Sequence, residues 1–232
     1  MKNIYFTMLV LVASGPFAGA ACAQENRPPE VKSLTAVEKG AREVKGRELI
    51  STARPAVRIK FDDDFKYVGT QSFVLYNVAH AEQHFFVEAD RQGNIRRLYW
   101  VQFEGYLPDN KHTYDYKSAR TVNLGGLEFF ADSRPANLSA QPPPPDSDGA
   151  RARAFLASKN LRTASDDILL QRLIHLTDAT RRNELLIIYV EDLATTGLTA
   201  ADLAPGGSAA SRWPEMSKAL LERATKGVKI QR

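Results

Sequence analysis

The chain has 232 residues, of which 44% are hydrophobic and 25% are charged, and its formal net charge is +4. These proportions are typical of a globular protein, and the length allows one large domain or two small ones. A positive charge this small and this scattered excludes an extended nucleic-acid-binding surface, so we expect no nucleic-acid partner.

Residues 1–23 have the pattern of a secretory signal peptide. Lys2 supplies a positive charge, residues 4–12 form a short apolar segment, and Ala21 and Ala23 are small residues at the two recognition positions of a cleavage site. We therefore expect cleavage after Ala23. The protein is then exported, either to the periplasm or out of the cell.

The rest of the chain is expected to form a single domain. Lipidation at Cys22 is an alternative to cleavage after Ala23, although the aliphatic residue typical of a lipidation site is missing. Residues 24–30 are polar and rich in proline, which predicts a disordered arm, and residues 31–232 follow as one domain. No later segment approaches the roughly 20 apolar residues of a spanning helix, so no transmembrane segment is expected.

Residues 31–50 are predicted to form an amphipathic helix. Apolar side chains recur there at steps of three and four residues, and charges of both signs lie between them. The apolar positions are Val31, Leu34, Val37, Ala41 and Val44. We expect the mixed-charge face of this helix to be solvated.

Strands follow the predicted helix. Residues 57–61 alternate apolar and basic side chains, and three aspartates separate them from residues 65–76, which are rich in aromatic and β-branched residues. A second hairpin is predicted from residues 85–89 and 95–106, because Gly93 and its neighbours form a turn signal between them. Shorter strands are expected near residues 121–124 and 127–131.

Residues 134–150 are interpreted as a loop or linker. Four consecutive prolines at 142–145 favour a polyproline II segment, which forms neither helical nor ladder hydrogen bonds. Such segments also serve as ligands for other proteins, so a contact with a protein partner is the alternative interpretation.

The composition after the prolines is typical of helices. Helices are predicted at residues 148–158, 165–176 and 211–227, and the apolar run in residues 184–192 predicts a buried strand. One strand cannot build a core alone, so we expect it to join the earlier strands. The predicted fold class is therefore α+β, with an antiparallel, strongly curved or half-barrel sheet packed on helices from the N- and C-terminal parts.

Two of the four histidines lie in residues 80–90, whose sequence is HAEQHFFVEAD. Alternate residues of a strand share a face, but four residues span about 13 Å, which is too far for both histidines to bind one metal ion. The three residues considered as metal ligands are His84, Glu88 and His112. We expect no cofactor, and a metal-dependent enzyme that uses these three residues is the alternative.

A second candidate site lies at the end of the strand predicted at residues 95–106. Trp100, Gln102, Glu104 and Tyr106 alternate along it and share one face, which is typical of the rim of an aromatic-lined concavity. No nucleophile motif or phosphate-binding loop is present. We therefore expect non-catalytic binding of an apolar or amphipathic small molecule.

A third interpretation is an envelope protein that acts through protein contacts. The proline run and the predicted N-terminal helix would be its contact elements. The sequence identifies neither the protein partner nor the oligomeric state.

Overall fold

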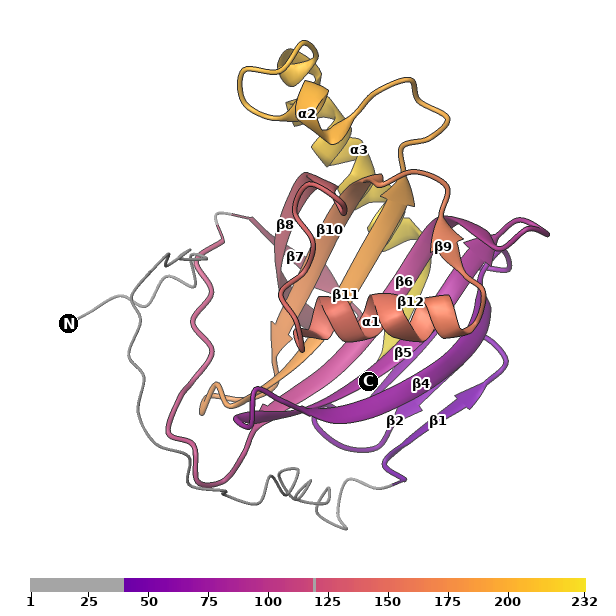
Figure 1. Ribbon diagram of the computed structural model, residues 1–232. Coiled ribbons are helices and arrows are strands. Elements are labelled where there is room, and N and C mark those ends of the chain that lie inside the picture. Colours follow the sequence, from indigo (N-terminus) through magenta and orange to yellow (C-terminus); the bar gives the residue numbers. More distant parts are fainter. Residues whose placement is uncertain (1–39, 119) are drawn as a thin grey trace, which may run out of the picture. The chain divides into compact units, whose positions relative to one another are not determined.

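The computed structural model describes residues 40–118 and 120–232 (Figure 1). Strands make up 46% of these residues and helices 17%. The strands form two mainly antiparallel sheets. The predicted signal peptide, the predicted arm and the first part of the predicted N-terminal helix lie outside the described residues.

The larger sheet has eight strands, and seven of them follow the order β4-β5-β6-β11-β10-β8-β7 while β9 pairs with β6. Their bounds are β4 (Lys66–Leu75), β5 (Ala79–Ala89), β6 (Asn94–Tyr106), β7 (Thr121–Leu124), β8 (Leu127–Asn137), β9 (Arg162–Thr163), β10 (Asp167–Leu176) and β11 (Asn183–Asp192). The hairpin predicted at residues 85–106 and the strand predicted at residues 184–192 are confirmed as β5–β6 and β11.

The smaller sheet has the order β1-β2-β3-β12. Its strands are β1 (Arg42–Lys45), β2 (Glu48–Ser51), β3 (Val57–Phe61) and β12 (Val228–Gln231). The sheet therefore joins the first described strands to the last one, because β12 pairs with β3.

The larger sheet is covered on both faces (Figure 1). Helix α1 (Asp148–Ser158) crosses one face. The smaller sheet, α2 (Ala200–Leu203), the 3-10 turn η1 (Ala210–Arg212) and α3 (Trp213–Lys226) contribute to the core on the other. Successive side chains of β6 point to opposite faces of the larger sheet, so this strand contributes to the core on each face. Tyr99 and Val101 face the smaller sheet, while Leu98 and Trp100 face α1. A central strand with two apolar faces is the expected result.

The predicted α+β class is wrong, because the structure is mostly β-sheet with two sheets and a few short helices. The described part of the predicted N-terminal helix is the β1–β2 hairpin, which turns at Gly46 with φ +61. Residues 165–176, also predicted as a helix, contain β10 in the middle of the larger sheet. Its consecutive apolar residues point alternately into the two cores, and such a run cannot be told from a buried helix by its periodicity.

The helices predicted at residues 148–158 and 211–227 are confirmed as α1 and α3. Ser147 caps α1 by accepting a hydrogen bond from the backbone N–H of Ala150 at 3.1 Å. Pro214 lies in the first turn of α3, and Gly227 ends that helix. The four prolines lie in the connection from β8 to α1.

Candidate ligand-binding pocket

A pocket of about 370 Å³ lies between the connection from β6 to β7 and the strands β8 and β10. Its lining consists of Asp115, Tyr116, Lys117, Ser118, Phe130, Asp132, Arg172 and Ile174. The volume is within the range of about 300–1,000 Å³ typical of small-molecule sites.

The turn between β10 and β11 holds the connecting segment against the sheet. The backbone N–H of Tyr114 donates to the carbonyl of Arg181 at 2.8 Å, and the Arg181 side chain donates back to the carbonyl of Tyr114 at 2.8 Å. Arg182 donates to the carbonyls of Leu107 at 2.8 Å and His112 at 3.2 Å. These bonds give an irregular segment a defined path along the pocket.

Aromatic rings form one wall of the pocket. The rings of Tyr116 and Phe130 lie 6.3 Å apart, and Ile174 adds an aliphatic surface. The stack continues away from the pocket, with 6.2 Å between Tyr116 and Tyr114 and 4.4 Å between Tyr114 and Tyr106. The wall is therefore apolar and is supported by further aromatic rings.

An ion pair gives the pocket a polar side. The Arg172 guanidinium donates to both carboxylate oxygens of Asp132, at 2.9 and 2.8 Å. The two residues are directly opposite each other on β10 and β8. Lys117 and Asp115 are exposed at the pocket, and Asp115 pairs with Arg181 at 3.0 Å. Apolar and charged groups thus share one concavity, which suits an amphipathic molecule.

Two carboxyl groups lie behind the aromatic wall. Glu104 and Glu184 are directly opposite each other on β6 and β11. The Tyr114 hydroxyl donates to Glu104 at 2.7 Å, and the Tyr116 hydroxyl donates to Glu184 at 2.6 Å. Burial raises the pKa of Glu104 to about 7, and burial together with the charge of Glu104 raises the pKa of Glu184 well above its usual range.

A ladder of glutamines leads from β4 to this carboxyl pair. Gln71 donates to Gln83 at 2.7 Å, Gln83 donates to Gln102 at 2.8 Å, and Gln102 donates to Glu104 at 2.5 Å. Gln83 also donates to the carbonyl of Asp148 in the first turn of α1, at 3.2 Å. The ladder supplies hydrogen-bond partners to polar groups that the core would otherwise leave unpaired.

The four residues predicted as a binding rim do share one face of β6, the face toward α1. Trp100 is buried in the apolar core beneath α1, and Gln102 is fully buried in the glutamine ladder. Glu104 is hydrogen-bonded to Tyr114, and Tyr106 stacks on Tyr114. The structure therefore places them behind and beside the pocket, and none of the four belongs to its lining.

The structure does not bring the three predicted metal ligands together. His84 is 2% exposed and shares hydrogen bonds with Glu82 at 2.8 Å and with the Tyr67 hydroxyl at 3.3 Å. Glu88 pairs with Arg97. His112 lies beyond β6 with its ring 6.2 Å from that of Tyr106.

Arg42 also belongs to the hydrogen-bond network around His84, since its guanidinium donates to Glu82 at 3.0 Å. Among residues 40–118 and 120–232, no three His, Cys, Asp or Glu side chains are grouped so that they could hold a metal ion.

Sequence reasoning missed the residues of the pocket itself. Tyr114 and Tyr116 alternate within HTYDYK, and that spacing could have suggested an extended segment with aromatic side chains on one side. Arg172 was hidden by the incorrect prediction of a helix over residues 165–176. Asp132 and Phe130 showed no local signal of a site.

The fold is that of a mainly antiparallel two-sheet β protein with a helix on the outer face of its larger sheet. Comparisons with protein-family models, with curated proteins and with solved structures return no match for this chain. None of the helices in the described segments has the length and apolarity needed to traverse a lipid bilayer.

Proposed function

We propose that this protein binds an amphipathic small molecule in the pocket beside Tyr116 and Phe130, and that it acts by binding rather than by catalysis. As part of this proposal, residues 1–23 direct it to export, so that the ligand is met outside the cytoplasm. The observation that carries the proposal is a pocket of about 370 Å³ that combines an aromatic wall with the Arg172–Asp132 ion pair.

The pocket has an apolar wall and a charged side, and this arrangement suggests how a ligand would lie. Its apolar part would cover the rings of Tyr116 and Phe130, where contact removes apolar surface from water. Its polar end would lie toward Arg172, Asp132 and Lys117, which offer charges of both signs. A few polar groups in a mainly apolar site are the usual source of orientation in small-molecule binding.

The position of the titrating carboxyls supports binding rather than acid–base catalysis. Glu104 and Glu184 have raised pKa values, but both lie outside the lining of the pocket. Their oxygens accept hydrogen bonds from the hydroxyls of Tyr114 and Tyr116. A general acid or base must reach the reacting atom directly or through one water molecule.

Thermal denaturation with two probes of opposite charge, lauric acid and dodecyltrimethylammonium, tests the proposal. We expect at least one probe to bind and to raise the melting temperature. A probe at about 100 times its dissociation constant stabilises the folded state by about 2.7 kcal/mol. Native mass spectrometry should then show one bound molecule per chain.

Two alanine variants locate the binding. Phe130→Ala removes half of the aromatic pair, so we expect a loss of affinity of at least roughly tenfold, because burial of an aromatic side chain is worth about 1.5–3 kcal/mol. Tyr76→Ala is the matched control, since Tyr76 is 48% exposed on the β4–β5 turn and does not line the pocket. The proposal is wrong if neither probe binds, or if both variants weaken binding equally.

A further inference from the structure

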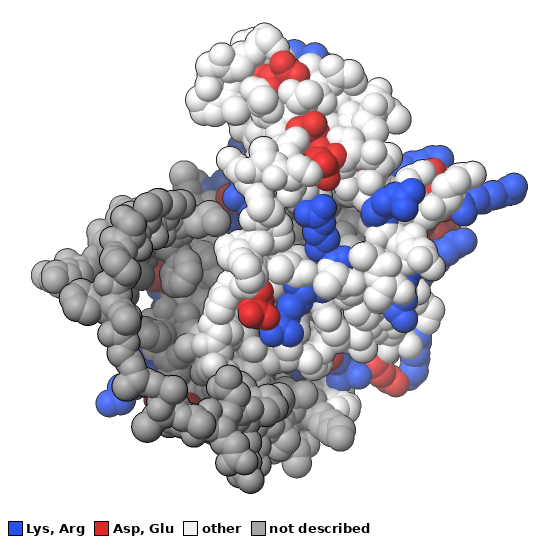
Figure 2. All heavy atoms as spheres, viewed as in Figure 1, with Lys and Arg blue, Asp and Glu red and all other residues white. Residues whose placement is uncertain are grey.

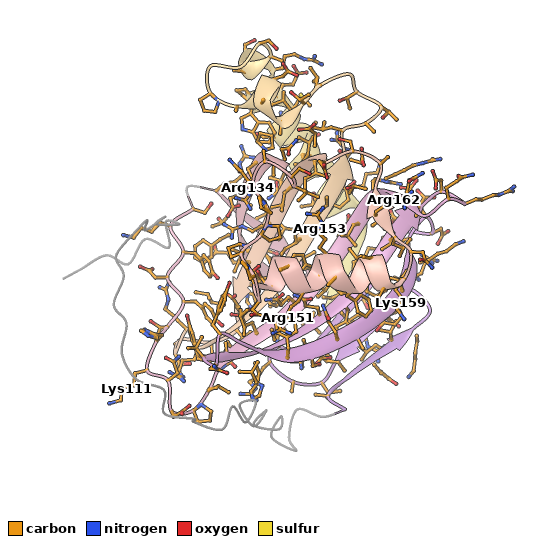
Figure 3. The ribbon with its side chains drawn as sticks, in the orientation of Figure 1. Lys111, Arg134, Arg151, Arg153, Lys159 and Arg162 are labelled. Carbon is orange, nitrogen blue, oxygen red and sulfur yellow. The ribbon has the colours of Figure 1, made fainter. Side chains whose placement is uncertain are left out.

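Five cationic side chains surround α1 on the outer side of the larger sheet (Figure 3). They come from three parts of the chain: β8, α1 with its C-terminal cap, and β9. We call them the α1 basic surface: Arg134, Arg151, Arg153, Lys159 and Arg162. In the space-filling view, lysine and arginine atoms are spread over this side of the molecule, with fewer aspartate and glutamate atoms among them (Figure 2).

Most of these cations have no acidic partner. Arg151 pairs with Asp146 at 3.3 Å, whereas Arg153 donates to the carbonyl of Leu138 at 3.3 Å. The Lys159 ammonium lies 5.6 Å from the centre of the Phe155 ring. Within the described part of the chain, Arg134, Arg153, Lys159 and Arg162 form no ion pair with a carboxylate. The positive charge of this surface is therefore largely uncompensated.

The outer side of the smaller sheet carries paired as well as unpaired charges, because the exposed lysines Lys60 and Lys229 lie opposite each other there and form no ion pair within the described residues. Three ion pairs lie there, and they join Lys45 to Glu43 at 2.7 Å, Arg58 to Glu48 at 3.6 Å, and Arg47 to Asp63. Charges of the same sign that lie close together repel one another and do not stabilise a fold. Paired charges of opposite sign cause no such repulsion. Four unpaired cations close together on the α1 basic surface indicate that it fits an anionic partner.

The exposed side of α1 also limits what that partner can be. Between the cations, Ala154, Ala157 and Ser158 are exposed, so long basic side chains rise above small ones. Among the described residues, Tyr76 is the large hydrophobic side chain that is exposed, and it lies on the β4–β5 turn. The surface therefore offers charge without an apolar anchor.

The shape of the surface favours a broad anionic layer over a small anion or a linear polymer. Eleven helical residues extend about 16 Å, and β8 and β9 add cations on either side. A linear polyanion is usually held in a cationic groove. Here the cations lie on and beside a helix that packs on a sheet, and none of them lines the pocket described above.

We propose that the α1 basic surface adsorbs to a lipid bilayer that contains anionic phospholipids, without insertion of the chain through this surface. Each lysine or arginine near such a bilayer contributes about 1 kcal/mol of attraction. This interaction is separate from the proposed ligand binding and does not depend on it.

Vesicle sedimentation of the intact chain tests the proposal. We expect binding at low ionic strength to phosphatidylcholine vesicles with about 30 mol% phosphatidylglycerol, and weak binding to pure phosphatidylcholine. The Arg153→Gln/Arg162→Gln variant should bind roughly 30-fold less tightly, because two charges are removed. In about 0.5 M NaCl the binding should be lost, since the Debye length is then only a few ångströms.

The matched control removes two exposed lysines from the smaller sheet, in the Lys60→Gln/Lys229→Gln variant. It has the same net charge as the first variant, and its binding should stay within about twofold of the unmodified chain. The Arg134→Gln/Lys159→Gln variant removes two other charges from the α1 basic surface, and it should show a similar loss of vesicle binding. It therefore tests the proposal even if the first variant does not fold.

Three results would overturn the proposal. One is an equal loss of binding in the surface and control variants, which would indicate an effect of net charge alone. The second is binding that is unchanged in all variants, which would place the membrane contact elsewhere in the chain. The third is binding to dextran sulfate without binding to the anionic vesicles, which would identify a soluble polyanion as the partner.

Discussion

Glu104 and Glu184 show how strongly the fold alters single residues. The pairing of β6 with β11 sets them directly opposite each other, where two negative charges would repel. Burial raises the pKa of Glu104 to about 7 and that of Glu184 well above its usual range. Burial also raises the pKa of Asp148, in the first turn of α1. The folded protein therefore retains protons that an unfolded chain would release.

The replacement Glu104→Gln should reduce the pH dependence of stability. Because the pKa of Glu104 is higher in the folded state, the folded state binds more protons between about pH 4.5 and pH 7. The free energy of unfolding therefore falls as the pH rises through this window, by on the order of 3 kcal/mol for Glu104. Urea unfolding at several pH values should show a shallower decline in the variant.

Glu128→Gln is the control for this experiment, because Glu128 is exposed on β8. It should follow the unmodified protein at every pH. If Glu104→Gln and the unmodified protein lose stability in parallel, the carboxyl of Glu104 does not titrate as the structure indicates.

At the scale of elements, the end of α3 is fixed by one tyrosine of β6. The Tyr99 hydroxyl donates to the carbonyl of Ala224 at 2.9 Å, and its ring lies 4.7 Å from that of Tyr189 and 4.8 Å from that of Phe65. A Cβ atom at Gly227 would lie only 2.4 Å from the Tyr99 hydroxyl oxygen. The Tyr99 hydroxyl therefore leaves no room for a Cβ atom at position 227, which accounts for the glycine at the end of α3.

The replacement Gly227→Ala should lower the free energy of unfolding by about 1–3 kcal/mol, because Tyr99 is packed too tightly to move away. In a Tyr99→Phe background the same replacement should cost less, since the hydroxyl that it meets is gone. Chemical denaturation of the two single variants and the double variant measures this coupling. An equal cost of Gly227→Ala in both backgrounds would contradict the proposed contact.

At the scale of the whole molecule, the two sheets share one core. Residues from β3, β6, β8, β11 and α3 meet in it. The last strand, β12, pairs with β3 and buries Val228 and Ile230. Strand β12 thus completes the pairing of β3, so that segments far apart in the sequence form one sheet.

Deletion of residues 228–232 should therefore destabilise the whole protein. Loss of two buried aliphatic side chains costs about 3–6 kcal/mol, at about 1.5–3 kcal/mol each, and β3 loses its neighbour. A single cooperative unfolding transition should shift to much lower denaturant concentration. Deletion of Arg232 alone, which is exposed, is the control and should change little. A small effect of the longer deletion would show that the smaller sheet is independent of β12.

Prediction from the sequence succeeded where a local signal was strong and failed where two structures share one pattern. The hairpin around Gly93 follows from a turn signal, the strand at residues 184–192 from an apolar run, and the helices α1 and α3 from their composition. The helix predicted at residues 165–176 was wrong, because a strand covered on both faces lacks the alternation of apolar and polar residues that distinguishes a strand from a helix.

The residues of the pocket also differ in whether the sequence shows a local signal for them. The alternation of Tyr114 and Tyr116 is visible in the sequence. Their neighbours Phe130 and Arg172 come from strands that are distant along the chain, and no local pattern connects them.

By itself, the sequence determined the positions of the strongest turns and helix ends, because glycine, proline and capping residues act through their own backbone and nearest neighbours. Only the tertiary structure decided which residues meet. The order of strands in the larger sheet sets Glu104 against Glu184 and Arg172 against Asp132. Those contacts depend on strand pairing between distant segments, which is a property of the whole chain.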